Sequence, residues 1–461
     1  MESFQTLSPI EGRVLFSRTY ATTQQLEEVL NRAQKGSVDW KYVSLEERIS
    51  ILRRFVDAVV AQKDVLAKEL TEQMGRPIRY SAGEISGFAQ RATVMLDMAK
   101  EQLADYHPPA QEGFTRFIRR EPLGVVLVLS PWNYPYLTAV NAIIPALAAG
   151  NSVVLKHSEQ TALVAERLQE AAQHIGLSSD VFQIVHCTHD QVATLIQDSR
   201  VDFVAFTGSV EGGHAVQRAA SERFIGLGLE LGGKDPAYVR ADANFEHAVE
   251  NIVDGAFFNS GQSCCGIERV YVHESLYDQF IDAFAKTVKG YVLGNPMDEK
   301  TTLGPMVRTK NADHVRAHIQ EAIEAGAKPL IDSDLFPNAK ENSPYLAPQV
   351  LTNVDHSMRV MSEESFGPVV GIMSVQSDEE AIQLMNDSQF GLTASIWSMN
   401  EEESMKIADQ LATGTVFMNR CDYLDPHLAW VGVKNSGRGC TLSKVGYEHL
   451  TRPKSFHFRK I

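Results

Sequence analysis

Between Pro122 and about Asn435 the chain alternates short apolar segments with amphipathic helical segments, and this alternation limits the possible folds more than any other feature. Apolar strands separated by helices are typical of parallel sheets covered on both faces. The first series of predicted strands is 125–129, 153–155, 182–185, 203–206 and 224–229. Helices are predicted between them, from about Pro135, Thr161, Asp190 and Ser209. This part of the sequence predicts one doubly wound α/β domain.

A second series of the same kind follows and predicts a second α/β domain. Its predicted strands are 270–272, 329–331, 369–373, 394–397 and 416–418, with helices from about Ser275, Thr309, Asp378 and Glu401. A chain of 461 residues is too long for one ordinary core, which agrees with two domains. No internal repeat, low-complexity tract or Pro/Ser linker separates them, so we expect a broad, fixed interface.

Two further segments alternate in the manner of exposed strands but have no obvious place in either sheet. They are residues 114–120 and 454–458, whereas residues 23–104 have helical periodicity. We expect 105–122 and 436–461 to form a small assembly element, which predicts a homodimer or homotetramer. The remaining boundaries are then 1–104 with 123–232 for the first domain and 233–435 for the second.

Composition excludes several classes of function. The net charge of −15, from 43 basic and 58 acidic residues, argues against nucleic-acid and anionic-membrane partners. Five sparse cysteines in so long a chain indicate a reducing compartment without disulfides, and no His/Cys cluster has the spacing of a metal site. The N-terminus lacks the features of a signal peptide and no apolar run approaches membrane-spanning length, so we expect a cytoplasmic protein.

Polar residues follow three strands of the first series at the edge where parallel strands end. They are Asn133, the pair Lys156 and Glu159, and a helix start at Ser209. Free N–H groups at the helix start suit a diphosphate, Lys156 can donate to ribose hydroxyls and Glu159 can accept from them. Taken alone, Ser209 is better explained as an N-cap, and Lys156 with Glu159 as a solvated helix start. Together they favour a dinucleotide site.

Two nucleotide motifs are absent or broken in the glycine-rich segment 226–234. The spacing of its glycines does not fit GxGxxG, so a standard Rossmann fingerprint is not present. Gly228 to Lys234 matches GxxxxGK, but Asp235 stands where a P-loop needs Ser or Thr, and its carboxylate would repel phosphate. A nucleotide hydrolase is therefore excluded.

One glutamate and a pair of adjacent cysteines are candidates for catalysis. Glu230 ends an apolar strand, where burial raises a carboxyl pKa and makes a usable general base; the alternative is a residue that caps a turn. Cys264 and Cys265 follow a predicted helix over 245–259 and a Gly-Gln turn, whose N–H groups can stabilise a thiolate. We interpret Cys264 as the nucleophile and Cys265, like the other cysteines, as a small buried side chain.

The chain resembles the aldehyde dehydrogenase superfamily along nearly its whole length, specifically its NAD(P)-dependent, non-phosphorylating, hydrolytic type. The order and spacing of several motifs carry the resemblance. They are Pro131-Trp132-Asn133, 156–159, Phe206-Thr207-Gly208-Ser209, 229–234, 258–264 with Arg269, 363–368, and Asn435-Ser436-Gly437.

The resemblance implies a role for each matched residue. In catalysis, Cys264 attacks the aldehyde, Asn133 joins the Cys264 N–H in the oxyanion site, and Glu230 activates the hydrolytic water. The implied cofactor contacts are Trp132, Lys156, Glu159, Gly208, Ser209, Glu364 and Phe366. The first domain would bind the cofactor and the second would be catalytic. NAD is expected rather than NADP, because a carboxylate at Glu159 would repel a 2′-phosphate.

The product and the substrate follow less directly. Family members that transfer the acyl group to coenzyme A generally lack the glutamate found at Glu230, so the resemblance favours a free acid. Ala142 and Thr441 replace a Lys and a Glu common in the family, which leaves Glu230 without that proton path. Alternatives are an acylating dehydrogenase or a catalytically silent binding homologue.

The loop 419–430 is expected to line the substrate entrance, with Arg420, Tyr423 and Trp430 as candidate contacts. Arg420 would suit a succinate-semialdehyde-type substrate, or form an ordinary salt bridge, whereas Tyr423 and Trp430 suit an aromatic or apolar aldehyde.

Overall fold

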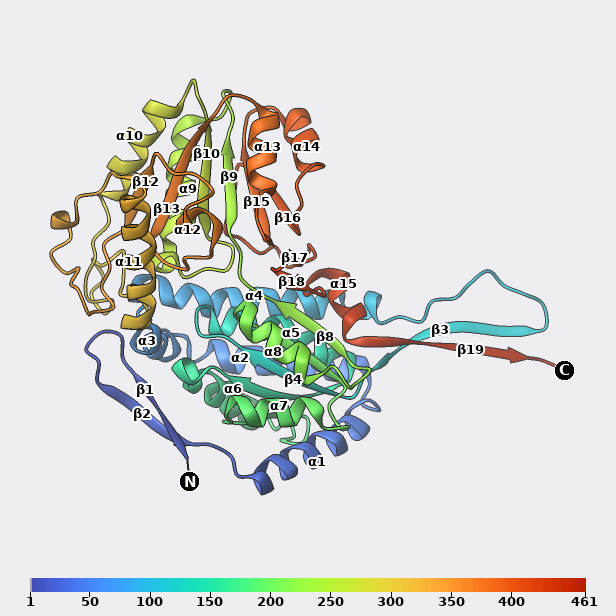
Figure 1. The fold of residues 1–461 in the computed structure, drawn as a ribbon. Coiled ribbons are helices and arrows are strands. Elements are labelled where there is room, and N and C mark those ends of the chain that lie inside the picture. Colours follow the sequence, from blue (N-terminus) through green and yellow to red (C-terminus); the bar gives the residue numbers. More distant parts are fainter. Residues whose placement is uncertain (1) are drawn as a thin grey trace.

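The computed structural model describes residues 2–461 and shows two α/β domains with a long two-stranded arm projecting from them (Figure 1). The first domain contains a six-stranded sheet with the order β18-β8-β7-β4-β5-β6. Its strands are β4 (Val125–Ser130), β5 (Ser152–His157), β6 (Phe182–Ile184), β7 (Phe203–Thr207), β8 (Gly226–Glu230) and β18 (Gly437–Arg438). All neighbours are parallel except β18, which runs antiparallel to β8. The five predicted strands form, with β8 beginning two residues later than expected.

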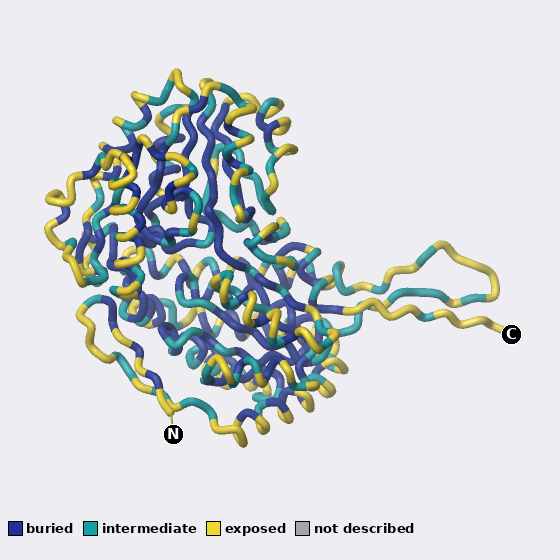
Figure 2. The backbone as a smooth tube through the Cα atoms, viewed as in Figure 1, coloured by how far each residue is buried: buried dark blue, intermediate teal, exposed yellow. Residues whose placement is uncertain are grey.

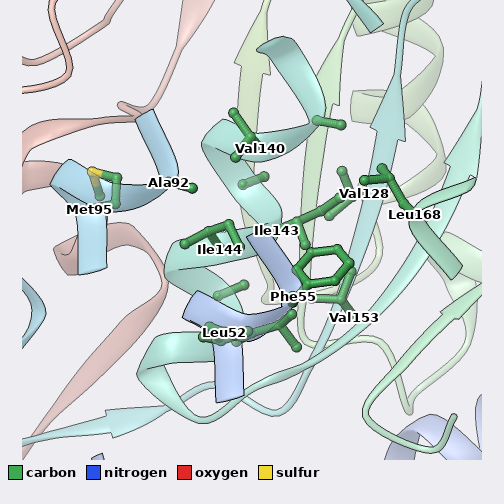
Figure 3. Packing of buried hydrophobic residues seen from close by; sticks show 14 of the residues in the cluster. Leu52, Phe55, Ala92, Met95, Val128, Val140, Ile143, Ile144, Val153 and Leu168 are labelled. Atoms are coloured by element: carbon green, nitrogen blue, oxygen red, sulfur yellow. The ribbon is translucent and has the colours of Figure 1, made fainter. Parts of the chain in front are cut away.

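Helices cover both faces of this sheet, as the apolar strands predicted. The helices are α1 (Thr23–Trp40), α2 (Leu45–Val60), α3 (Lys63–Met74), α4 (Ile78–Gln102), α5 (Pro135–Ala149), α6 (Ala162–His174), α7 (His189–Gln197) and α8 (Val210–Ala219). Alternate residues of β4 face opposite ways: Val128 packs against α2, α5 and α6, whereas Leu127 packs toward α1, α7 and α8. Figure 3 shows Phe55 of α2 and Ile143 of α5 meeting over β4 and β5.

The second domain contains a seven-stranded sheet with the order β11-β12-β13-β10-β9-β15-β16, parallel except for the β11–β12 pair. Its strands are β9 (Asp235–Val239), β10 (Ile267–His273), β11 (Lys328–Pro329), β12 (Gln349–Thr352), β13 (Val369–Val375), β15 (Thr393–Trp397) and β16 (Thr415–Met418). The helices are α9 (Phe245–Phe257), α10 (Tyr277–Val288), α11 (Thr309–Glu324), α12 (Arg359–Ser362), α13 (Asp378–Asn386) and α14 (Glu401–Ala408). The expected fold, two parallel-sheet α/β domains, is confirmed.

The sequence did not predict β9 and β12. β9 begins Asp-Pro, a pair typical of turns, yet it is a central strand. Asp235 is tolerated there because its carboxylate accepts hydrogen bonds from the backbone N–H (3.1 Å) and hydroxyl (2.6 Å) of Thr393 on β15. Burial raises the pKa of Asp235 to about 8, so the side chain can carry a proton inside the sheet.

The projecting arm consists of β3 (Phe114–Pro122) and β19 (Thr451–Arg459), which pair antiparallel along their full length. The segments 114–120 and 454–458, for which the sequence offered no place in either large sheet, therefore pair with each other within one chain. Phe117 and Phe456 stack at a centroid distance of 4.4 Å, while Phe458 is exposed. Figure 2 shows that the arm stands away from the buried body of the molecule. The short helix α15 (Ser443–His449) precedes β19.

Two small two-stranded sheets lie outside the main sheets and the arm. The hairpin β1 (Ser3–Leu7) and β2 (Val14–Thr19) was not predicted and lies against the first domain, where Thr6 donates to the backbone oxygen of Glu159 (2.5 Å). β14 (Phe390–Gly391) pairs with β17 (Val433–Lys434). No helix among the described residues has the length and apolar character needed to cross a membrane.

Candidate active site

The loop that carries Cys264 is held in an unusual backbone conformation. The predicted helix over 245–259 ends at Phe257, because Asn259, Ser260 and Gly261 have φ values of 53°, 56° and 69° in the left-handed region. Gly261 is required at its position, since a Cβ there would lie 2.2 Å from the backbone oxygen of Gly367. The loop is thus locked against the segment 363–368 of the second domain.

Hydrogen bonds from Gln262 fix the turn just before Cys264. Its side chain donates to the backbone oxygen of Asn259 (3.0 Å) and accepts from the backbone N–H of Val307 (2.8 Å). The backbone oxygen of Gln262 accepts from the side-chain amide of Asn133 (3.2 Å), which follows β4. The structure therefore brings Asn133 and the Cys264 loop together across the two domains.

Asn133 is itself held by a buried charged pair that the sequence did not reveal. Arg76 donates to the backbone oxygen of Asn133 (2.5 Å) and to the side chain of Asn259 (3.1 Å), and it pairs with Glu84. The side chains of Arg76 and Glu84 are 2% and 0% exposed. Removing either partner would leave an uncompensated charge in the interior and destabilise the fold. The hydrogen bonds of Arg76 therefore hold the backbone at Asn133 in place.

Cys264 is part-exposed and lies where two cavities meet. One cavity of about 610 Å³ is lined by Cys264 together with Asn133, and continues along the ends of β7 and β8. The other, of about 300 Å³, is lined by Cys264 and by residues of α4, α5 and the loop after β16. Glu230 and Thr207 line both cavities. One thiol is thus accessible from two separate directions.

Glu230 ends β8, as predicted, and its carboxylate accepts hydrogen bonds from two hydroxyls. Thr207 donates to one oxygen (3.1 Å) and Thr441 donates to the other. Burial raises the pKa of Glu230 above its ordinary value, and the two hydroxyls partly oppose that rise by stabilising the charged form. The hydroxyl of Thr441 occupies one oxygen of the carboxylate, while Ala142 lies in the apolar core.

The neighbouring thiol differs sharply from Cys264. Cys265 is buried and donates to a carboxylate oxygen of Asp422 (3.1 Å). Its hydrogen bond with the Cys264 side chain and its burial raise the pKa of Cys265 well above the ordinary range. Burial also raises the pKa of Cys187 to about 12 and that of Cys440 to about 11. No group of side chains in the described part of the chain has the composition of a metal site.

The larger cavity collects most of the residues expected to contact a cofactor. Those that line it are Trp132, Gly208, Ser209, Glu364 and Phe366. Ser209 is the N-cap of α8 and accepts from the N–H of Gly212 (3.1 Å), which leaves other N–H groups of the first turn facing outward. The rings of Trp132 and Phe366 meet edge to face at 5.7 Å.

A further cavity of about 410 Å³ continues from Ser209 between α7 and α8 and is lined by Lys156 and His189. Glu159 is not among its lining residues. The carboxylate of Glu159 accepts a hydrogen bond from the hydroxyl of Tyr20 (2.7 Å), which follows the N-terminal hairpin. Of the two predicted ribose contacts, Lys156 faces the cavity and Glu159 is held beside it.

Glu364 is positioned by a buried network that the sequence did not indicate. Its carboxylate accepts from the N–H of Gly233 (3.0 Å), and burial together with nearby Glu268 raises its pKa to about 8. Glu268 pairs with Lys234 and accepts from the N–H groups of Ser365 (2.8 Å) and Phe366 (2.9 Å). This carboxylate fixes the backbone that presents both Glu364 and Phe366 to the cleft.

The three candidate substrate contacts lie in different places. Tyr423 and Trp430 line the smaller cavity, and Trp430 is buried. Arg420 is exposed and does not line it; its guanidinium stacks on the Tyr423 ring at 3.4 Å. Two polar residues that the sequence did not single out, Arg91 and Asn141, form part of the cavity wall. They belong to helices that looked like packing elements.

Comparison with known proteins agrees with this arrangement. The model of the aldehyde dehydrogenase family matches residues 1–456. Succinate semialdehyde dehydrogenase [NAD(P)+] Sad of Escherichia coli is 32% identical over 96% of this chain and 95% of its own length. The 3-sulfolactaldehyde dehydrogenase of Priestia aryabhattai is 32% identical over 88% of this chain and 85% of its own.

A solved structure shows the same fold with a cofactor. The betaine aldehyde dehydrogenase of Staphylococcus aureus, in complex with NAD+, superimposes with a TM-score of 0.93 at 30% identity and covers 100% of this chain and 92% of its own. A family match across almost the whole sequence, together with relatives at this identity, places the chain in one family. The protein belongs to the aldehyde dehydrogenase family and is an NAD-dependent aldehyde dehydrogenase.

Proposed function

We propose that the protein oxidises its aldehyde to the free carboxylic acid through a covalent intermediate on Cys264. The observation that supports this is the position of one part-exposed thiol between two cavities, with Asn133 and Glu230 beside it. The smaller cavity would hold the aldehyde and the larger one the nicotinamide end of NAD. The nicotinamide, as hydride acceptor, and the Cys264 thiol, as nucleophile, would then approach the same carbonyl carbon from different sides.

In the first half of the reaction the Cys264 thiolate adds to the carbonyl carbon and forms a thiohemiacetal. The backbone N–H of Cys264 and the side-chain amide of Asn133 would stabilise its oxyanion, and the Arg76–Glu84 pair keeps Asn133 in place. NAD, when bound, accepts the hydride whose loss turns the thiohemiacetal into a thioester.

In the second half Glu230 would remove a proton from water, which attacks the thioester and releases the acid. The raised pKa of Glu230 suits a base that works near neutral pH, and its position on both cavities lets it face the acylated Cys264. A base at this place makes coenzyme A unnecessary as an acyl acceptor. The hydrolytic product therefore fits better than a coenzyme A thioester.

The residues that would hold NAD have side chains suited to a dinucleotide, and they lie along the cavities in the order of its ribose, diphosphate and nicotinamide parts. Residues 1–104 and 123–232 supply Trp132, Lys156, Gly208 and Ser209, whereas residues 233–435 supply Glu364, Phe366 and the thiol. The first turn of α8 offers N–H groups for the diphosphate, between the cavity that contains Lys156 and the cleft that contains Glu364. Glu159, held by Tyr20, would disfavour NADP by repelling its 2′-phosphate.

The decisive experiment is to measure NADH formation from an aldehyde panel without coenzyme A. We expect NADH to accumulate with stoichiometric free acid, detected by mass spectrometry, and a rate that coenzyme A does not raise. NADP replaces NAD in a parallel series and is expected to be the poorer cofactor. NADH that appears only with coenzyme A would replace this proposal with an acylating reaction, and no NADH at all would favour a catalytically silent homologue.

We also propose that the arm, residues 105–122 with 436–461, assembles the chain into a homodimer or homotetramer. β3 and β19 form a two-stranded sheet that packs little of its surface against its own body, and Phe458 is 58% exposed on it. A two-stranded sheet is marginal alone and gains stability from a partner. Light scattering at micromolar concentration is expected to give a molar mass two or four times the 51.1 kDa of one chain. A monomeric mass would contradict the proposal.

A further inference from the structure

We propose that Arg91 binds an anionic group at the far end of the aldehyde, so that the preferred substrates are short aldehydes with a carboxylate or similar anionic tail. This inference rests on the proposed function, because it takes the cavity of about 300 Å³ beside Cys264 as the aldehyde site. It names the class of substrate that this site selects.

Arg91 reaches the cavity because two helices pack unusually closely there. Gly87, Gln90 and Arg91 form one face of α4, and Leu137 and Asn141 form the facing side of α5. A Cβ on Gly87 would lie 2.8 Å from a methyl carbon of Leu137, so only glycine permits this approach without movement of Leu137. The close packing leaves the guanidinium in the wall of the cavity that Cys264 lines.

The guanidinium is buried without a counter-ion. Arg91 is 9% exposed, and its Nη1 donates to the backbone oxygen of Leu137 (2.8 Å) and the side-chain oxygen of Asn141 (3.3 Å). Among the described residues no group accepts from its Nε or Nη2, and no carboxylate pairs with it. Arg76, by contrast, pairs directly with Glu84. A buried, unpaired cation is costly, and an anion in the cavity would remove that cost.

Three acidic residues also line this cavity, and among the described contacts none of them forms an ion pair or hydrogen bond with Arg91. Asp422 accepts from the hydroxyl of Ser263 (2.7 Å) and from Cys265, and Glu230 accepts from two threonines. Burial raises the pKa of both carboxyls, the positive charge of Arg91 opposes that rise, and the guanidinium keeps its own proton. Asp254 is exposed at the rim. Both carboxylates are thus held by other donors, and the Nε and Nη2 groups of Arg91 remain available to an anionic group in the cavity.

The relatives are named for aldehydes of both charges. Sad and the Priestia enzyme are named for aldehydes with an anionic group, whereas the Staphylococcus aureus structure is of an enzyme named for a cationic aldehyde. Within this chain the competing cation is Arg420, which lies outside the cavity and stacks on Tyr423. Arg91 is thus the better placed receptor for an anionic tail.

The test compares three aldehydes: succinic semialdehyde, neutral butanal and cationic betaine aldehyde. For the wild type we expect kcat/KM to favour succinic semialdehyde by roughly 30-fold or more, the effect of one buried charge pair. Arg91→Gln is expected to remove that preference through KM for succinic semialdehyde, with butanal changed little. Arg79→Gln, an exposed arginine on the same helix, is the matched control and should keep the preference.

Because Arg91 also holds Leu137 and Asn141, Arg91→Lys is measured beside it, and the lysine is expected to recover part of the preference since it keeps the charge but not the planar fork. A second readout needs no turnover: succinate should slow alkylation of Cys264 by iodoacetamide in the wild type and not in Arg91→Gln. A sulfonate-tailed aldehyde shows whether the site accepts any anion or a carboxylate only.

The outcomes separate this inference from the proposed function. Oxidation of butanal and succinic semialdehyde with equal kcat/KM would overturn the role of Arg91 and leave the dehydrogenase mechanism intact. Loss of the preference in Arg420→Gln but not in Arg91→Gln would move the anion site to the loop after β16. No oxidation of any aldehyde would refute the proposed function itself.

Discussion

Replacing Cys264 by serine is expected to abolish aldehyde-dependent reduction of NAD, with a loss of at least about ten-thousandfold in kcat. A thiol is partly ionised near neutral pH and is intrinsically nucleophilic, whereas a hydroxyl needs an adjacent base. In the described structure no histidine lines the cavity between Cys264 and α4, and the carboxylate of Glu230 there already accepts hydrogen bonds from Thr207 and Thr441. The measurement is NADH absorbance under saturating aldehyde, together with NAD binding by fluorescence to show that the cleft is intact.

Cys265→Ser is the matched control, because it makes the same chemical change one residue later. A serine at this position can still donate to Asp422, and the buried Cys265 thiol is held in its neutral form by its surroundings. We expect this variant to keep kcat within severalfold of the wild type. An inactive Cys265→Ser beside an active Cys264→Ser would exchange the two assignments.

Within the two large sheets, the sequence best predicts the strands that are apolar on both faces. β4, β5 and β7 contain the continuous apolar runs 125–129, 153–155 and 203–206, so the burial of these strands could be expected from composition alone. β9 was not predicted because Asp235 and Pro236 resemble a turn. The buried aspartate is stabilised by the backbone N–H and the hydroxyl of Thr393, which lies more than 150 positions later in the chain. Contacts of that range leave no local signal.

The active site likewise contains some residues that local sequence reveals and others that only the folded chain brings together. Cys264 and Glu230 stand out locally, one in a glycine turn and the other at the end of an apolar strand. Arg91 lies in a helix with an ordinary amphipathic pattern, and its proximity to the thiol arises only when α4 packs on α5. Arg420 was the more conspicuous arginine because its loop is polar, yet the chain turns it outward. The local sequence pattern therefore identifies the reactive residues better than it identifies the residues that the fold packs around them.

Glu230→Gln is expected to lower steady-state turnover by roughly 10²- to 10⁴-fold, the usual contribution of a general base. Only the hydrolytic half of the reaction loses its base, so the first turnover should still release about one NADH per active site as a burst. Stopped-flow absorbance measures the burst, and intact mass after acid quench should show the acyl group on Cys264. Unchanged turnover, or slow turnover without a burst, would contradict the role of Glu230 in deacylation.

The two threonines that donate to Glu230 give the same assignment a pH dependence. Their hydrogen bonds stabilise the carboxylate, so they lower a pKa that burial has raised. In Thr441→Val one of them is lost, the pKa of Glu230 rises, and less of the enzyme carries the base at a given pH. The acidic limb of kcat against pH should therefore move to higher pH, with kcat near neutrality lower by roughly three- to tenfold and little change on the alkaline plateau. If Glu230 were a structural carboxylate, the same substitution would change stability but leave the position of that limb unmoved.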